Sequence, residues 1–348
     1  MEKKIVKCTS WLTELLDEAL PKFPILEKPT FQNREIKIID GSMVVQEGTK
    51  GKKGGKSLRI HTCHSLTKSS TGNIKLTDER TSESVKVLPI NPGDIILGDA
   101  GFGKGTAIEY VVSKKADALF RATPNHMKLT KDKKGKKKID MAGKLSKAKK
   151  DVLDFTCYIH TANGKYQKIR VIASRLPEEK AILAVKRKKR SASKKQSSIK
   201  ASTLIFAKWV ILITTLGKEY SAMELLELYR ARWQVELLFK RFKQSFKISR
   251  LPAASLEHSE VLVLLWLIMW ALTERQSVAF EKLLIAKNET MELYSVWATQ
   301  SLIVHQIKAL FSSIFLLISF DEDTIPILFR RLRNHRSSRC NQYSLFRF

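Results

Sequence analysis

The segment NPGDIILGDAGFGKGTAIEYVVSKK, residues 91–115, decides the fold class. It begins with a turn, and the short apolar run Ile95–Leu97 that follows predicts a buried strand. A glycine-rich loop spans 101–106, and the pattern after it predicts a helix. A buried strand that leads through a tight turn into a helix is typical of α/β proteins, so we expect a mixed α/β fold.

The same kinds of element are predicted on both sides of this segment. Upstream, REIKIID (34–40) and SLRIHTCHSL (57–66) have the composition of strands. Downstream, KWVILITTL (208–216) predicts another buried strand, and residues 221–246 predict one long helix. The order of these elements indicates an α/β core with an interruption between 121 and 205.

Basic residues dominate the charge of the chain. There are 63 Lys and Arg against 34 Asp and Glu, a formal net charge of +29, and 43% of the 348 residues are hydrophobic. The apolar content excludes a disordered tail, and the charge excludes an acidic protein. Residues 121–200 alone hold 25 Lys and Arg against 6 Asp and Glu. This basic block indicates a polyanionic partner such as nucleic acid.

Three lysine-rich runs lie within the basic block, at 131–138, 144–150 and 186–196. They are separated by two predicted strands, FTCYIH (155–160) and KIRVIASRL (168–176). Any one run could be a solvated loop at a hairpin tip. Three runs on one inserted β unit instead favour contact with nucleic-acid phosphates, because each such contact releases counterions.

Two aspartates, Asp40 and Asp99, each follow a predicted buried strand and precede small residues. In open α/β sheets, ligands and catalytic groups collect at the carboxyl ends of the strands. Either residue alone has a commoner role as a turn former or a helix cap. The two aspartates are therefore a candidate site, and the residues around them decide between a catalytic and a structural role.

The predicted long helix carries four polar residues, Tyr229, Arg232, Glu236 and Lys243. At about 100° per residue their side chains share one narrow stripe of the helix. The neighbouring arc is a predicted buried seam of Leu228, Val235, Leu238, Phe242 and Phe246. A carboxylate at the margin of an apolar face either binds a metal or pairs with a cation, and Arg232 is spaced to pair with Glu236. The spacing alone does not choose between these roles.

These residues together resemble the DDE transposases of the insertion sequence 4 family. The likeness covers about residues 31–250 and includes the run Tyr-x2-Arg-x3-Glu-x6-Lys in LYRARWQVELLFKRFK. It implies a ribonuclease-H-like catalytic core interrupted by a mostly β insertion domain and followed by a helical C-terminal region. It also implies that Asp40, Asp99 and Glu236 form a catalytic triad that holds Mg²⁺, or Mn²⁺ in its place. Hard cations of this kind prefer carboxylate oxygens.

The resemblance also implies which residues contact DNA. Tyr229, Arg232, Lys240 and Lys243 would hold the phosphate backbone at the transposon end. Trp209 would stack on a flipped base, although core packing is its commoner role. The implied activity is cleavage and strand transfer on double-stranded DNA, at terminal inverted repeats and at a target, by a homodimer. A catalytically inactive remnant that only binds DNA is the alternative.

Five segments follow from these expectations. They are a remnant N-terminal helical segment (1–30), the first part of the core (31–120), a basic β-rich insertion (121–205), the second part of the core with Glu236 (206–250), and a helical C-terminal region with a basic tail at 330–339 (251–348). Only 39 residues precede Asp40, so we expect a truncated copy that lacks the family's end-recognition region.

Other signals are weak. The longest apolar run, 261–272, is too short to cross a bilayer, so we expect no membrane segment. The family resemblance implies a cytoplasmic, nucleoid-associated bacterial protein. His61, Cys63 and His64 could ligate zinc, but no second cluster completes four ligands. The loop at 101–106 matches no nucleotide-binding pattern and predicts only a tight turn.

Overall fold

The structure is a computed structural model that describes residues 2–20, 34–46, 57–66, 70–78, 80–124, 127–245, 250–251, 256–286, 303–306 and 309. The chain divides into two compact units, Met1–Leu293 and Tyr294–Phe348. The fold described below is that of the first unit. Phe246 and the predicted basic tail at 330–339 lie outside the described residues.

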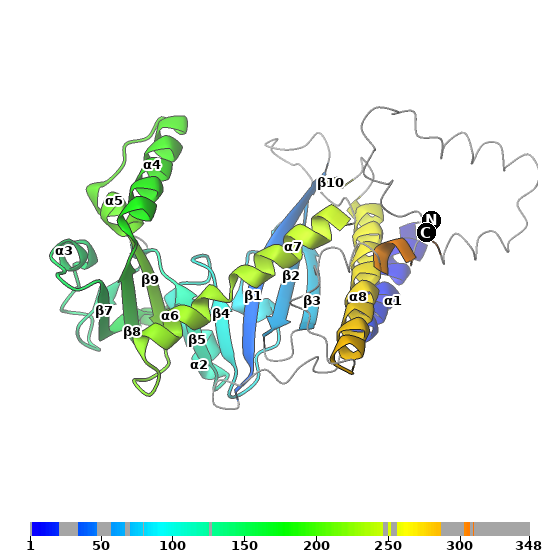
Figure 1. Cartoon of the computed structure of the whole chain (residues 1–348), viewed down its shortest axis with the longest axis horizontal. Coiled ribbons are helices and arrows are strands. Elements are labelled where there is room, and N and C mark those ends of the chain that lie inside the picture. The colour runs from blue at the N-terminus through cyan, green and yellow to red at the C-terminus, as the bar shows by residue number, and fades with distance from the viewer. Residues whose placement is uncertain are drawn as a thin grey trace, which may run out of the picture. The chain divides into compact units, whose positions relative to one another are not determined.

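Strands and helices alternate along the first unit (Figure 1). The strands are β1 (Ile36–Gln46), β2 (Ser57–Ser65), β3 (Ser70–Asp78), β4 (Ile95–Gly98), β5 (Asp117–Arg121), β6 (Leu129–Thr130), β7 (Val152–His160), β8 (Tyr166–Arg175), β9 (Trp209–Thr214) and β10 (Arg250–Leu251). The helices are α1 (Glu2–Ala19), α2 (Gly105–Ser113), α3 (Met141–Ser146), α4 (Glu178–Lys194), α5 (Ala201–Ala207), α6 (Ala222–Arg230), α7 (Trp233–Ser245) and α8 (Leu256–Ala286), with short 3₁₀ turns at Val85–Val87 and Ala162–Gly164.

All the described strands belong to one mixed sheet, in the order β3-β2-β1-β4-β5-β9-β8-β7-β6, with β10 parallel to β1. The three central strands β1, β4 and β5 are parallel, and the strands on either side of them are antiparallel to their neighbours. The predicted α/β class is confirmed. Strands β1, β2, β4, β7, β8 and β9 fall where the sequence predicts strands, whereas β3, β5 and β6 were not predicted.

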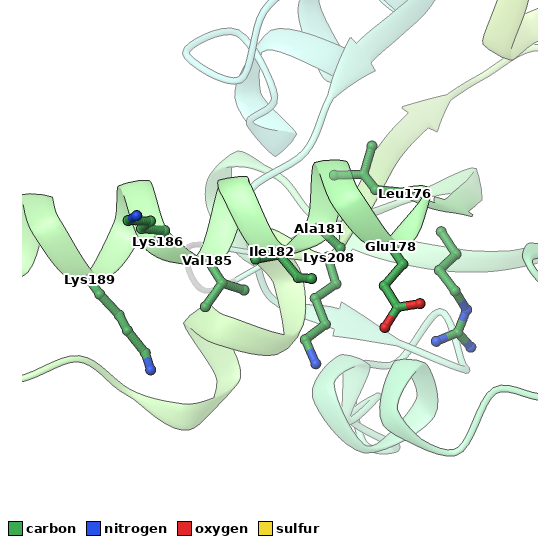
Figure 2. A pocket seen from close by; sticks show the side chains of 9 residues that line it. Leu176, Glu178, Ala181, Ile182, Val185, Lys186, Lys189 and Lys208 are labelled. Atoms are coloured by element: carbon green, nitrogen blue, oxygen red, sulfur yellow. The ribbon is translucent and has the colours of Figure 1, made fainter.

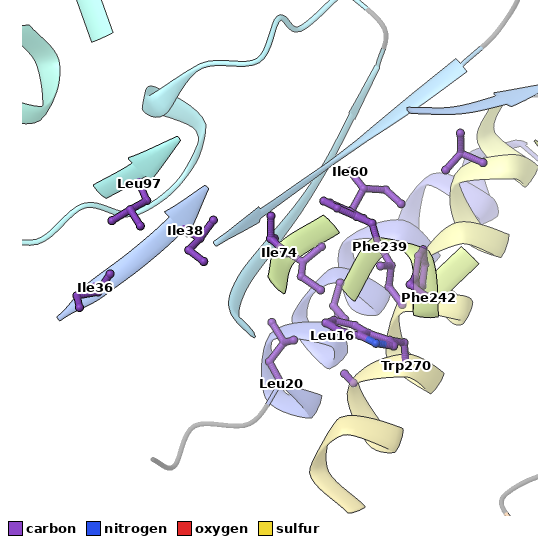
Figure 3. Close-up of a cluster of buried hydrophobic side chains, with 14 of the residues drawn as sticks. Leu16, Leu20, Ile36, Ile38, Ile60, Ile74, Leu97, Phe239, Phe242 and Trp270 are labelled. Carbon is purple, nitrogen blue, oxygen red and sulfur yellow. The ribbon is translucent and has the colours of Figure 1, made fainter. Parts of the chain in front are cut away.

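The sheet is buried on both faces at its centre. Ile95, Ile96 and Leu97 of β4 are all fully buried, as expected of a parallel strand covered on both sides. One face packs against α2 through Ile108 and Val111. The other face packs against α7, and Figure 3 shows the cluster of Ile38, Ile60, Ile74, Phe239 and Phe242 between them. These apolar side chains fix the position of α7 over β1 and β2.

Helices α1 and α8 lie side by side at the β3 end of the sheet (Figure 1). Leu12 and Leu16 of α1 and Val263 and Leu267 of α8 belong to the same buried cluster as the α7 contacts. The apolar run at 261–272 therefore serves this cluster. Among the described residues, no helix combines the length and apolar character that crossing a membrane requires.

The basic block differs from its prediction in two ways. Strands β6, β7 and β8 extend the central sheet through β9 and do not build a sheet of their own. The segment 121–205 also contains α3, α4 and α5, so the expectation of a mostly β insertion is wrong. The run 186–196 lies mainly in α4, because Ala, Leu, Lys and Arg favour helix and two glutamates occupy its first turn.

The predicted single helix at 221–246 is two helices. A capping box formed by Ser221 and Glu224 starts α6, in agreement with the predicted boundary. Helix α6 ends in a tighter turn of the 3₁₀ type. There the N–H groups of Ala231 and Arg232 donate to the carbonyl oxygens three residues back, at Leu228 and Tyr229. Helix α7 begins afresh at Trp233. Of the predicted polar stripe, Tyr229 thus lies on α6, Arg232 in the turn between the helices, and Glu236 and Lys243 on α7.

Arg170 ties the basic half of the sheet to the segment that enters α6. Its guanidinium is nearly buried and makes two 2.8 Å hydrogen bonds to the carboxylate of Asp154. It also donates to the carbonyl oxygens of Gly217 and Tyr220. Lys218, which is exposed, contacts the same carboxylate at 2.8 Å.

We predict that Arg170→Met lowers the free energy of unfolding by about 3–5 kcal/mol, because it removes one partner of a buried ion pair and leaves two carbonyls without donors. Lys218→Met is the matched control, since it removes an exposed partner of the same Asp154, and we expect a loss below about 1 kcal/mol. Urea unfolding monitored by tryptophan fluorescence measures both. Equal losses in the two variants would contradict the structural role given to Arg170.

Candidate active site

The register of β1 and β4 places two predicted acids beside each other. Ile36 pairs with Ile95 and Ile38 with Leu97, so continuing the same register puts Asp40 opposite Asp99. Because side chains alternate along a strand, both carboxylates face the side of the sheet that α7 covers. The sequence placed Asp40 at the end of a strand, but β1 continues to Gln46 and stays paired with β2 as far as Val45. Only the pairing with β4 ends before Asp40.

Asp40 is an electrostatically unfavourable carboxylate. Its side chain is 16% exposed, and burial raises its pKa to about 6. The nearby carboxylates of Asp99 and Glu83 also raise this pKa, whereas the N–H of Gly41, at 2.9 Å from Oδ1, and the guanidinium of Arg232 lower it. The favourable contacts do not offset the burial. A cation bound beside the carboxylate of Asp40 would therefore be stabilised.

Asp99 is held at the end of β4 by its own turn. Its Oδ1 accepts a 2.7 Å hydrogen bond from the N–H of Gly101. Tyr229 anchors α6 at the same place, because its hydroxyl donates to the carbonyl oxygen of Gly98 at 3.3 Å. Burial raises the pKa of Tyr229 above its ordinary value. The predicted tyrosine therefore contacts the backbone beside the second aspartate.

Glu236, the third predicted acid, is not joined to the two aspartates in this structure. Its side chain is 60% exposed and hydrogen-bonds to the guanidinium of Arg232, four residues earlier. Arg232 also lies 3.9 Å from Asp40, so one cation bridges the two carboxylates. Within the part of the chain that the structure describes, no three His, Cys, Asp or Glu side chains form a metal-ligating group. The triad therefore stays a prediction, while the alternative pairing of Arg232 with Glu236 is present.

The remaining predicted contact residues occupy different environments. Lys240 is exposed on α7. Lys243 is half-buried, and its ammonium donates to the carbonyl oxygen of Met43 in β1 at 3.4 Å. Burial lowers the pKa of Lys243. Trp209 is buried, with the guanidinium of Arg175 4.5 Å from the ring centre, so the structure shows the packing role for this residue.

A pocket of about 470 Å³ connects the predicted acids to the basic helices. Asp99, Arg232 and Glu236 line one side of it. The other side comes from the segment 121–205 and the start of β9, through Arg121, Lys188 of α4, Thr203 and Phe206 of α5, and Trp209. Carboxylates and cations therefore share one pocket.

Sequence reasoning missed two charged residues beside the aspartates. Glu83 lies in an irregular segment, pairs with Arg59 at 3.3 Å, and has its pKa raised by burial. A Cβ on Gly41 would lie only 3.0 Å from Glu83, so this glycine leaves room for the glutamate. Arg121 directly continues a buried strand, as Asp99 does, and the same rule about strand ends could have identified it.

Two weaker sequence signals have structural explanations. His61 is buried with Nε2 2.9 Å from the Thr77 hydroxyl, and burial lowers its pKa to about 4. Burial likewise raises the pKa of Cys63 to about 12. In the loop at 101–106, a Cβ on Gly105 would collide with the carbonyl oxygen of His160, so close packing of α2 requires this glycine.

A second pocket, of about 670 Å³, lies along α4 (Figure 2). Leu176, Ala181, Ile182 and Val185 give it an apolar side, and Ile182 is 60% exposed. Its cationic residues are Arg175, Lys186, Lys189 and Lys208. Helix α4 therefore presents cations to both pockets, because Lys188 reaches the one beside the acids.

Comparison with known proteins identifies related sequences. Residues 32–272 match the family model described as "Transposase DDE domain". The putative transposase InsL for insertion sequence element IS186A of Escherichia coli strain K12 is 28% identical over 228 residues, which is 63% of this chain and 60% of the relative. The transposase for insertion sequence element IS421 of Escherichia coli matches with the same figures. The chain thus spans about 60% of the length of these relatives.

Solved structures give a much weaker likeness. An endonuclease V from Ciona intestinalis, in complex with a DNA that contains an inosine followed by a ribo-adenosine, is 11% identical with a TM-score of 0.25. The match covers 65% of this chain and 88% of the endonuclease. A TM-score this low does not establish a shared fold.

We predict that Asp40→Asn stabilises the metal-free protein at pH 7.5 by about 2–3 kcal/mol, the free energy that corresponds to raising a pKa from 3.8 to about 6. A raised carboxyl pKa destabilises the fold only where the group is ionised, so the cost is complete above about pH 6 and absent below the unfolded value. The advantage of the variant should therefore shrink as pH falls to 4. Urea midpoints in EDTA at both pH values measure it, and a pH-independent difference would contradict it.

Proposed function

The chain belongs to the transposase DDE domain family, and we propose that it catalyses metal-dependent DNA cleavage and strand transfer at the ends of a bacterial insertion sequence. The observation that carries the proposal is the placement of Asp40 beside Asp99. Asp99 lines a pocket that also contains Arg121, Lys188 and Arg232, and Arg232 lies 3.9 Å from Asp40. A site that combines acids with cations suits a reaction in which a phosphodiester must be held next to hard metal ions.

The insertion sequence 4 type is the finer assignment that we propose. It rests on the order Tyr229, Arg232, Glu236, Lys243 in the sequence. We infer that β3, β2, β1, β4 and β5, with α2 on one face and α7 on the other, form the ribonuclease-H-like core. The segment 121–205 is then the insertion that carries most of the net positive charge of the chain.

The residues at the site fit divalent cations. Asp40 and Asp99 supply hard oxygen ligands, which Mg²⁺ and Mn²⁺ prefer. Their mutual repulsion and the burial of Asp40 favour a cation between them. Two such ions would activate the attacking hydroxyl and stabilise the leaving oxygen. Glu236 would be the third ligand once its carboxylate leaves Arg232, because the two now pair with each other.

Arg232 would be the residue that exchanges its carboxylate partner for a phosphate when DNA binds. Its planar guanidinium can bind a phosphate with two parallel hydrogen bonds, as it now binds carboxylate. A phosphodiester beside Asp99 would compete with Glu236 for this guanidinium. Lys240, which is exposed on the same helix, and Lys243 would extend the contact along the backbone of the DNA.

Helix α4 would hold DNA outside the pocket. It carries seven lysines and arginines in seventeen residues, and most of its side chains are exposed. Contacts of this kind are independent of base sequence and depend strongly on salt. We propose double-stranded DNA as the partner, first the terminal inverted repeats and then the target, with a homodimer pairing two ends.

A catalytically inactive DNA-binding protein is the second candidate function. The pairing of Glu236 with Arg232 favours it, because a permanent ion pair would prevent the third carboxylate from holding metal. The two functions differ in one measurable property. An inactive protein binds DNA in a salt-dependent way but does not cut it with Mg²⁺ or Mn²⁺.

We predict that Glu236→Ala lowers Mg²⁺-dependent cleavage of a DNA carrying the element's ends by about a hundredfold or more, because a metal ligand is lost. DNA binding should stay nearly intact. Glu227→Ala removes an exposed glutamate from α6 and is the matched control, with cleavage unchanged. Gel-resolved cleavage and fluorescence anisotropy provide the two readouts. Equal cleavage by wild type and Glu236→Ala would refute the triad, and no cleavage by the wild type would favour the second function.

We predict that changing Lys186, Lys188 and Lys189 together to Gln reduces the slope of log K against log salt by about 2 to 3, since each lost phosphate contact removes about 0.9. The same three positions changed to Arg keep the charge and should keep the slope. Anisotropy titrations of a duplex between about 50 and 200 mM salt measure both variants. An unchanged slope in the Gln variant would show that α4 does not contact the DNA backbone.

A further inference from the structure

Thr62 carries a buried hydroxyl that nothing in the fold uses. It lies in the middle of β2 and is only 1% exposed. Its Oγ1 has no hydrogen-bond partner in the structure. Burying a hydroxyl without a partner costs free energy, and valine has the same branched shape without that cost. A polar group left unpaired in this way calls for a specific explanation.

The position of Thr62 relative to the site supplies one. In the antiparallel pair of β1 and β2, Thr62 lies directly opposite Asp40. Residues that face each other across such a pair have their side chains on the same face of the sheet, with Cβ atoms about 4.5–5.5 Å apart. On the other side of Thr62, β3 places Ile74 opposite it. Of its two cross-strand neighbours, only Asp40 can accept a hydrogen bond.

Apolar side chains from β1, β2 and β3 lie beside the hydroxyl on this face. Ile38, Ile60 and Ile74 belong to the same buried cluster as Phe239 of α7 (Figure 3). Ile38 and Ile60 lie two residues from Asp40 and Thr62 along their strands, on the same face. Ser42 and His64 lie two residues from Asp40 and Thr62 along the same strands, opposite Ile60 and Ile38, but Asp40 and Thr62 are the polar pair that face each other directly. Their coincidence on paired strands favours a shared role.

Asp40 has room for another donor. Its Oδ1 accepts from the N–H of Gly41, and its Oδ2 lies 3.9 Å from Arg232. An ionised carboxylate offers about four lone-pair positions. A hydroxyl rotates freely about its own bond, so Thr62 could donate to Asp40 after a small reorientation of the carboxylate.

We propose that Thr62 is a positioning residue, whose hydroxyl donates to the carboxylate of Asp40 when this carboxylate holds a divalent ion. The inference rests on the proposed function, since it takes Asp40 to be a metal ligand. Ligating carboxylates are commonly fixed by outer hydrogen bonds, and loss of such a partner weakens metal binding about tenfold to a hundredfold. The hydroxyl of Thr62 is then unpaired in the metal-free site and gains its partner when Asp40 binds the ion.

A purely structural role for Thr62 makes a different prediction. If the residue only fills space in a strand, valine would be equivalent or better in every respect, because it keeps the branched shape and removes the unpaired hydroxyl. Serine would be worse, because it loses the methyl group. The two variants therefore separate shape from hydrogen bonding.

The test measures Mn²⁺ binding to the full chain by isothermal titration calorimetry, and thermal midpoints without metal, for Thr62→Val and Thr62→Ser. We expect Thr62→Val to bind Mn²⁺ about tenfold more weakly while its midpoint equals or exceeds that of the wild type. Thr62→Ser should bind Mn²⁺ within about twofold of the wild type despite a lower midpoint. Thr62→Val would then lose affinity without losing stability, and Thr62→Ser would lose stability without losing affinity.

Asp99→Ala separates failure of the inference from failure of the proposed function. If Asp99→Ala weakens Mn²⁺ binding and Thr62→Val does not, the metal site stands and the role of Thr62 is wrong. If Asp99→Ala binds Mn²⁺ as the wild type does, the metal site itself is wrong, and the role of Thr62 is overturned with it. If Thr62→Ser loses as much affinity as Thr62→Val, the methyl group matters and not the hydroxyl, which also overturns the inference.

Discussion

The parallel register of β1 with β4 is the constraint on which the rest of the site depends. It aligns Ile38 with Leu97 in the core, and the same register continued by two residues brings Asp40 beside Asp99. One strand pair therefore produces both the buried centre of the sheet and two neighbouring like charges. A one-residue slip would move both sets to opposite faces, so the apolar residues that stabilise the sheet also enforce the repulsion. Holding the two aspartates close together lowers the stability of the fold.

The neighbouring residues have different effects on the ionised carboxylates. The N–H of Gly41 and the guanidinium of Arg232 stabilise the ionised form of Asp40, and burial opposes it. Arg232 simultaneously binds Glu236, so the predicted acid on α7 pairs with a side chain that can also bind phosphate. The turn at 231–232 lets this arginine lie between the two carboxylates. Substrate contact and completion of the acidic site would thus be linked through one residue.

The local sequence pattern was sufficient to predict the elements that depend mainly on neighbouring residues in the chain. The all-apolar run Ile95–Leu97 and the alternation before Asp40 were sufficient to identify β4 and β1. Helix α4 was missed because a dense lysine run resembles a solvated loop, although its helix-forming residues and two N-terminal glutamates were visible. The break before α7 has no proline or glycine to announce it. Thr62 comes near Asp40 through the register of β1 with β2, and Glu83 comes near it from an irregular segment, and no local periodicity specifies either approach.

The continuity of the sheet through β9 has a consequence for how this protein could have arisen and how it can be altered. β9 follows the basic segment in sequence, yet it lies between β5 and β8 and bonds to both. Removing the segment 121–205 would leave β9 with a row of unpaired backbone groups along a flat apolar edge. Such edges pair readily with other chains, so the shortened protein would be prone to aggregate. The insertion cannot be treated as a detachable module, because it also protects the edge of the sheet that it extends.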